Sequence, residues 1–153
     1  MALGALSIPA THPAPADLAA WLSAVSLAGL GRPVGAHPGW EREAAGAARA
    51  WLRLVDEGRH NASWAAASSL LKEEVGPAGW NAALRAVRDP LGRCLSRTLR
   101  SRDVVEGPSG DLRGPYVVIR FDSVFEGRSP VAETITPVLG ADGRWRVAAY
   151  FIR

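Results

Sequence analysis

Several features that are common in enzymes and in disulfide-linked proteins are scarce or missing in this chain. Its 153 residues include one cysteine, Cys94, so it can form neither an internal disulfide nor a zinc site from paired thiolates. The histidines, His12, His37 and His60, lack the spacing of metal ligands on a helix, and we predict no metal site and no cofactor. A glycine-rich phosphate loop and a nucleophile elbow are also absent, which excludes nucleotide hydrolysis and α/β-hydrolase chemistry.

A strong charge of one sign is missing as well. The chain has 18 basic and 15 acidic residues, a formal charge of +3, and every basic residue except Lys72 is an arginine. The densest basic stretch contains Arg85, Arg88, Arg93, Arg97, Arg100 and Arg102. Because this stretch lacks the aromatic residues on which bases stack, we expect its arginines to pair with acidic side chains and predict no nucleic-acid partner.

No apolar run is long enough to cross a bilayer, and we predict no membrane span. The least polar segment, residues 18–30, fits the core of a signal peptide with small residues at 34–36, although Asp17 stands where a positive charge is expected. A short helix over residues 17–30 that docks against the domain is the alternative. Both interpretations stay open: the protein is expected to be exported or periplasmic if residues 1–36 are cleaved, and cytoplasmic otherwise.

Apolar residues recur at helical spacing in three segments that precede every clear strand. These predict helices over residues 41–58, 61–75 and 78–87. Glu41 and Glu43 lie in the first turn of the first helix, where the helix dipole favours negative charge.

The second half of the chain is rich in alternating and β-branched segments bounded by turn residues. Strands are predicted over residues 94–104, 114–121, 130–136 and 145–152. Asp142-Gly143 suits the tight hairpin between the last two strands. The predicted fold is α+β, with three N-terminal helices packed on one face of a curved four-stranded antiparallel sheet. One such domain over residues 41–153 fits the length, after a proline-rich, poorly ordered leader at residues 1–40.

A set of spaced landmarks between residue 44 and the end of the chain resembles a bacterial family. The landmarks are residues 51–58, 63–64, 80, 88–92, 96–97, 114–118, 133–134 and 142–153. In these the chain is similar to the family called domain of unknown function 4019, whose members look like small, often exported proteins. The resemblance implies a cystatin-like or nuclear-transport-factor-2-like cone, and it brings no agreed activity.

Two carboxylates on the predicted strands, Asp122 and Glu133, are candidates for acid-base catalysis. Proton transfer in a cone-shaped domain needs a carboxylate inside an apolar pocket, where burial raises its pKa. Alternation along the second strand puts Arg120 and Asp122 on the face opposite Phe121. We favour the simpler interpretation that Arg120 and Asp122 face solvent and that Glu133 pairs with an arginine across strands.

Aromatic residues offer a second kind of candidate site. Trp51, Trp64 and Trp80 lie on the apolar stripes of the three predicted helices, and together with sheet residues they could line an apolar pocket with a few polar groups. The candidate lining is Trp51, Trp64, Trp80, Tyr116, Arg120, Phe121 and Tyr150. Packing of these rings in the core is the favoured alternative.

The sequence therefore favours a non-catalytic domain that binds a small apolar or amphipathic ligand, or a protein through an exposed sheet face. An enzyme of the polyketide-cyclase or ketosteroid-isomerase style, with Asp122 or Glu133 as the acid-base group, is one alternative. A structural partner subunit, for example a homodimer formed sheet to sheet, is another.

Overall fold

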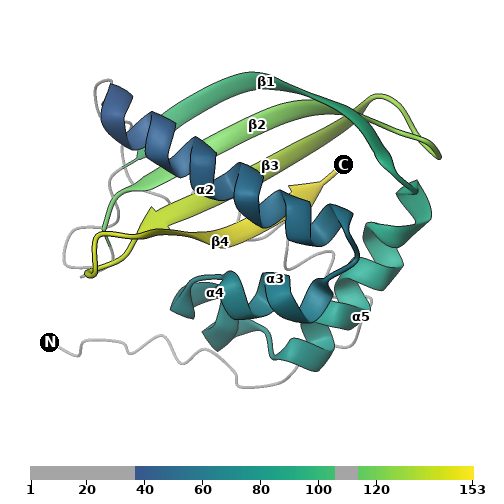
Figure 1. Cartoon of the computed structure of the whole chain (residues 1–153), viewed down its shortest axis with the longest axis horizontal. Helices are drawn as coiled ribbons and strands as arrows, with labels where there is room; N and C mark the ends of the chain where they lie inside the picture. Colours follow the sequence, from purple (N-terminus) through teal and green to yellow (C-terminus); the bar gives the residue numbers. More distant parts are fainter. Residues whose placement is uncertain (1–36, 106–113) are drawn as a thin grey trace, which may run out of the picture.

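The computed structural model describes residues 37–105 and 114–153. Within these ranges, α-helices and a short 3-10 helix precede four β-strands (Figure 1). The strands form one antiparallel sheet in the order β1-β2-β3-β4, so the predicted α+β class with a four-stranded antiparallel sheet is confirmed. The predicted helix over residues 17–30 and the cleavage site considered at 34–36 lie outside the described residues.

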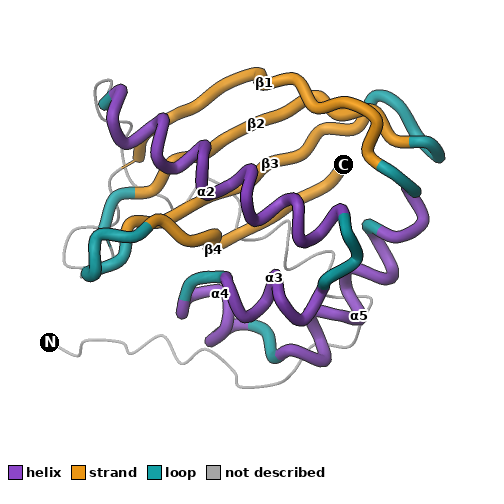
Figure 2. Tube along the Cα trace, viewed as in Figure 1, coloured by secondary structure: helices purple, strands orange, loops and turns teal. Residues whose placement is uncertain are grey.

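Helix α2 (Pro38–Asp56) runs across one face of the sheet and contacts all four strands (Figures 1 and 2). It begins at Pro38 instead of the predicted residue 41, because the fixed φ of proline suits the first turn of a helix. Its buried side chains recur at the predicted helical spacing. They are Ala44, Ala45, Ala48, Trp51, Leu52 and Val55.

The prediction of one helix over residues 61–75 is wrong, because the structure has two helices there. Helix α3 (His60–Ala66) and helix α4 (Ser69–Glu74) are separated by Ala67 and Ser68, whose ψ angles of 168° and 163° are those of extended backbone. The helical spacing of apolar residues continues through the break, so periodicity alone did not reveal it.

Two hydrogen bonds of Ser68 account for this break. Its backbone N–H donates to the Val147 carbonyl at 2.9 Å, which ties the chain to the last strand. Its Oγ accepts from the Leu71 N–H at 3.4 Å and caps the new helix. Helix α5 (Pro77–Val87) and the 3-10 helix η2 (Asp89–Leu91) then lead into the sheet.

Four strands follow, and three of them are longer than predicted, β1 by one residue. They are β1 (Cys94–Val105), β2 (Tyr116–Phe125), β3 (Val131–Leu139) and β4 (Trp145–Ile152). Strands β2 and β3 pass their predicted ends at residues 121 and 136. The Asp142-Gly143 turn joins β3 to β4 as predicted, with Gly143 at a φ of 72°.

Strands β1 and β4 are the two edges of this sheet. The edge of β4 receives the Ser68 N–H at Val147, whereas no described strand pairs with the outer edge of β1. Strand β1 carries Leu95, which is 55% exposed, and the exposed arginines Arg100 and Arg102.

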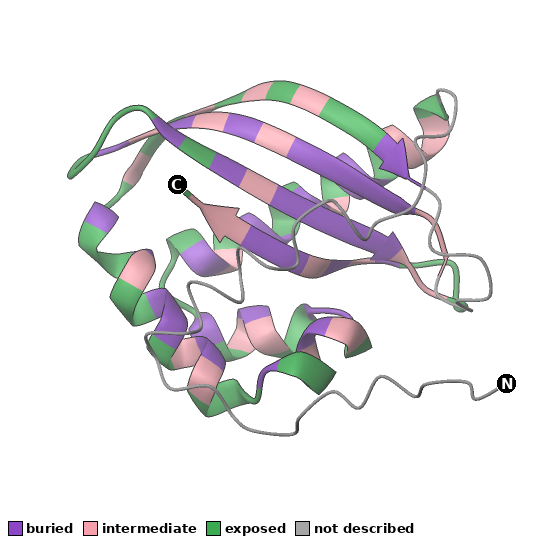
Figure 3. Ribbon diagram, turned by 180° about the vertical axis from the view of Figure 1, so that it is seen from behind, coloured by how far each residue is buried: buried purple, intermediate pink, exposed green. Residues whose placement is uncertain are grey.

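Figure 3 shows buried residues along the strands, and these fall into apolar clusters on both faces of the sheet. Val117, Ile119 and Phe121 point toward the helices and join the main core around Trp51 and Leu52. The alternate residues of β2 belong to a second apolar cluster on the opposite face. Its buried members are Val105, Tyr116, Val118 and Val138. The alternation predicted for this strand is therefore confirmed.

Substitution by alanine should have opposite effects on stability at two of the glycines. A Cβ at Gly114 would lie 2.5 Å from the Leu139 carbonyl oxygen, whereas a Cβ at Gly46 on α2 meets nothing within 4 Å. We expect Gly114→Ala to lower the free energy of unfolding by about 1–3 kcal/mol through overpacking. Gly46→Ala should raise it by about 0.5–1 kcal/mol, because alanine favours the helix. Urea denaturation measures both, and equal effects of one sign would contradict the structure.

Candidate functional site

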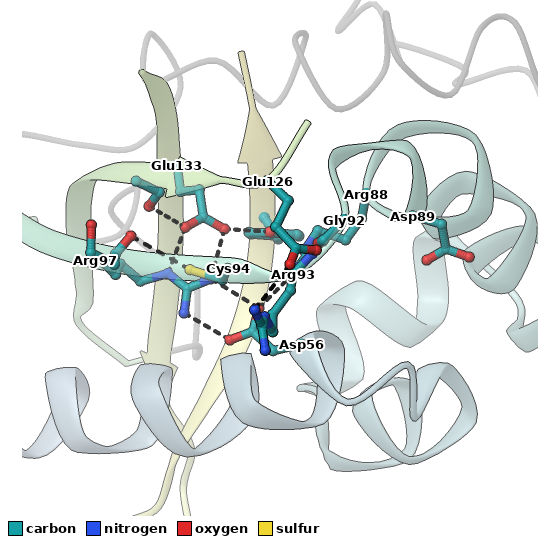
Figure 4. Close-up of polar contacts among 12 residues, drawn as sticks. Asp56, Arg88, Asp89, Gly92, Arg93, Cys94, Arg97, Glu126 and Glu133 are labelled. Atoms are coloured by element: carbon teal, nitrogen blue, oxygen red, sulfur yellow. Dashed lines mark hydrogen bonds and ion pairs between the residues drawn. The ribbon is translucent and has the colours of Figure 1, made fainter. Parts of the chain in front are cut away.

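The most deeply buried carboxylate is Glu133, whose side chain is fully enclosed between β3 and the helices (Figure 4). Arg97 from β1 donates from Nε to Oε2 at 2.5 Å and from Nη2 to Oε1 at 3.2 Å. The Tyr150 hydroxyl donates to Oε1 at 2.6 Å, and the Ser123 hydroxyl donates to Oε2. Each carboxylate oxygen thus accepts two hydrogen bonds.

A second carboxylate, Asp56 at the end of α2, shares the same arginine. Arg97 donates from Nη1 to Oδ2 at 2.8 Å and from Nη2 to Oδ1 at 3.0 Å. Arg88 donates from Nη2 to Oδ1 of Asp56 at 2.9 Å, and from Nη1 to the Gly92 carbonyl at 2.7 Å. The carboxylates Glu133 and Asp56 and the guanidinium groups of Arg97 and Arg88 form what we call the buried ion cluster (Figure 4).

The environment fixes the charges of this cluster. Burial alone would raise the pKa of Asp56, but hydrogen bonds from Arg97 and Arg88 outweigh it and hold the pKa below its ordinary value of 3.8. Burial opposes the charge of Arg97, yet hydrogen bonds to both carboxylates raise its pKa overall. Burial, with the adjacent charge of Glu133, raises the pKa of Tyr150 well above its ordinary value. Arg97 and Asp56 therefore stay charged at neutral pH, and Tyr150 stays a donor.

This arrangement suits a structural role better than catalysis. Glu133 would have to give up an existing hydrogen bond before it could accept a proton from a substrate. The cluster also links the end of α2 to β1 and β3.

The other sequence candidate, Asp122, lies on the opposite face of the sheet from Glu133. Its side chain is 47% exposed and pairs with Arg100 at 3.1 Å. Arg120, on the same face, donates to Asp103 and to the Ser101 hydroxyl. The structure does not bring Asp122 and Glu133 together.

The predicted pocket residues Trp51, Trp80 and Tyr150 come together in the core. The Trp51 ring centroid lies 5.8 Å from that of Trp80 and 5.3 Å from that of Tyr150. Trp51 donates to the Ser63 carbonyl at 2.8 Å, and Trp80 donates to the Ser63 hydroxyl at 3.0 Å. A hollow of about 20 Å³ lies beside Trp80 and Tyr150, which is room for one water molecule.

The remaining pocket candidates are dispersed. Phe121 joins the same core, and Tyr116 lies in the cluster on the other face of the sheet. Trp64 is half-buried, donates to the Val75 carbonyl at 2.8 Å and lies under the ammonium group of Lys72. The seven predicted lining residues therefore do not surround one cavity of ligand size.

A larger cavity opens between α4 and the β3–β4 hairpin, and we call it the α4–hairpin groove. Its volume is about 510 Å³. Its walls are Ala67, Ser68, Ser69, Leu70 and Lys72 on one side, and Val138, Leu139, Gly140, Ala141, Asp142 and Arg146 on the other. This groove was not predicted from the sequence. The available signals were Ser68, a residue type that starts helices, and the Asp142-Gly143 turn.

Neither a metal-binding cluster nor a membrane-spanning helix is found in the part of the chain that the structure describes. In residues 37–105 and 114–153, no three His, Cys, Asp or Glu side chains gather in a way that could hold a metal ion. Among the same residues, no helix combines the length and apolar character that crossing a membrane requires.

The fold is that of a small α+β domain in which helix α2 runs across one face of an antiparallel four-stranded meander. The chain belongs to the family described as "Protein of unknown function (DUF4019)", which matches residues 47–150. This confirms the family resemblance carried by the sequence landmarks. Neither a curated protein nor a solved structure matches the chain.

Loss of the carboxylate charge should lower the stability of the fold much more at Glu133 than at Asp122. Glu133→Gln leaves Arg97 less well paired in a buried site, and we expect the free energy of unfolding to fall by about 3–5 kcal/mol. Asp122→Asn is the matched control and should cost less than about 1 kcal/mol, because its ion pair is exposed. Urea denaturation measures both variants. A cost for Glu133→Gln no larger than that for Asp122→Asn would contradict the structural role of the cluster.

The lowered pKa of Asp56 predicts a pH-dependent contribution to stability. Because the folded pKa lies below the unfolded value near 3.8, this contribution is complete above that value and is lost as pH falls through the folded pKa. The stability difference between wild type and Asp56→Asn should therefore shrink as pH falls from about 5 to about 2. Urea denaturation across this range measures it, and a difference that stays constant with pH would contradict the assignment.

Proposed function

We propose that this domain is a non-catalytic binding protein that holds a small amphipathic ligand in the α4–hairpin groove. The observation that carries the proposal is the groove itself. Its volume of about 510 Å³ falls in the range of sites that enclose small molecules. The saturated hydrogen bonding of Glu133 supports a binding role over acid-base catalysis.

The composition of the groove supports an amphipathic ligand. Ala67 and Val138 are buried, and Leu70 and Leu139 are half-buried, so each wall contributes apolar side chains. Lys72 on one wall, and the Asp142 and Arg146 pair on the other, add charged groups. A ligand with an apolar body and a polar end matches this combination.

We further propose that the sheet is the curved wall of a cystatin-like or nuclear-transport-factor-2-like cone. Register shifts interrupt β1 between Leu99 and Ser101, and β3 between Thr136 and Pro137. Such bulges bend a strand and increase its twist, which supports a curved sheet.

Dye binding tests the groove directly. The neutral probe N-phenyl-1-naphthylamine should bind the wild-type chain with an increase in fluorescence. Ala141→Trp places an indole on the wall of the groove and should weaken binding at least about tenfold, because the ring takes space that the ligand needs. Ala82→Trp is the matched control, since Ala82 is also an exposed alanine and lies on α5 outside the groove lining. Failure of the wild type to bind the probe, or equal binding by both variants, would overturn the proposal.

A further inference from the structure

We propose that the α4–hairpin groove selects amphiphiles with an anionic end and that Lys72 binds this end. The inference rests on the proposed function and names the class of ligand for the same groove. Lys72 is the only lysine in the chain and lies on the α4 wall.

Lys72 is a cation without a carboxylate partner. Its Nζ donates to the Ala65 carbonyl at 2.7 Å and lies 5.5 Å from the centroid of the Trp64 ring. Both partners are neutral, and no described carboxylate pairs with Nζ. An ammonium group has three N–H donors, and the carbonyl takes one of them, so further donors remain for an anion.

The other cation of the groove is already neutralised. Arg146 donates to Asp142 through two parallel hydrogen bonds, from Nη1 to Oδ1 at 2.9 Å and from Nη2 to Oδ2 at 2.7 Å. Hydrogen bonds from Arg146 lower the pKa of Asp142 to about 2, so this pair keeps both charges at neutral pH. Among the described residues that line the groove, Lys72 therefore carries the one positive charge that no carboxylate compensates.

The apolar surface of the groove is placed to receive the rest of such a ligand. Leu70 lies two residues before Lys72 on α4, and the opposite wall supplies Val138 and Leu139. A single alkyl chain can bury its methylene groups against these side chains while its carboxylate contacts Nζ. The overall formal charge of +3 adds a weak attraction for anions.

Competition against N-phenyl-1-naphthylamine tests this selectivity. Decanoate and 1-decanol each contain ten carbon atoms and differ in the charge of the head group. We expect Lys72→Gln to weaken the binding of decanoate about tenfold, because one charge-assisted hydrogen bond is lost. The affinity for 1-decanol should be unchanged. Lys72→Arg should retain the affinity for decanoate, because it keeps the positive charge.

The outcomes separate this inference from the proposed function. If Lys72→Gln weakens the binding of both compounds equally, or of neither, the groove still binds amphiphiles but the proposed contact between Lys72 and the anion is wrong. If neither compound displaces the dye from the wild type, this inference fails as well. If the wild type does not bind the dye at all, both proposals fall.

The single lysine allows a second readout that does not depend on affinity. Reductive methylation with ¹³C-formaldehyde labels Lys72 and the N-terminal amine, and it keeps the positive charge of each. We expect decanoate at saturation to shift the dimethyllysine signal in carbon-detected NMR, and 1-decanol to shift it much less. Equal shifts with both compounds, or no shift with decanoate, would overturn the contact with Lys72.

Discussion

The position of α2 on the sheet depends on one guanidinium group that two carboxylates share. Arg97 binds Glu133 on β3 and Asp56 at the end of α2, and Arg88 binds Asp56 from the other side. Buried charges lose their hydration, and the hydrogen bonds among them must offset that loss. These hydrogen bonds form together only when the end of α2, β1 and β3 take the relative positions seen here. The buried ion cluster therefore specifies the arrangement that the apolar core stabilises.

The break between α3 and α4 connects this fold to the groove. A continuous helix over residues 61–75 would carry Ala67 and Ser68 in helical conformation, and the Ser68 N–H would not reach Val147 in the same way. With the break, α4 begins beside β4 and faces the end of the β3–β4 hairpin. The groove is therefore a product of two local features far apart in the sequence, a serine cap and a glycine turn.

The features of the fold that depend on local sequence patterns could be predicted from the sequence. Alternation placed Phe121 toward the helices and Asp122 away from them, and Asp142-Gly143 marked the last hairpin. Pairing of Glu133 with an arginine was expected, but its particular donors could not be predicted, because they depend on where residues of β1, β2 and β4 lie relative to β3. The groove was missed for a related reason: Leu70 and Val138 are ordinary apolar residues until packing sets them on facing walls.

The difference between the two edges of the sheet affects how copies of this protein associate at high concentration. An open strand edge is a template for growth of the sheet by another chain, and β1 offers one with the apolar side chain of Leu95 in contact with water. Arg102 on the same strand is exposed and acts as a gatekeeper, since like charges repel an approaching copy of β1. This arginine thus opposes pairing of the open edge with another copy, and concentrated salt weakens its protection.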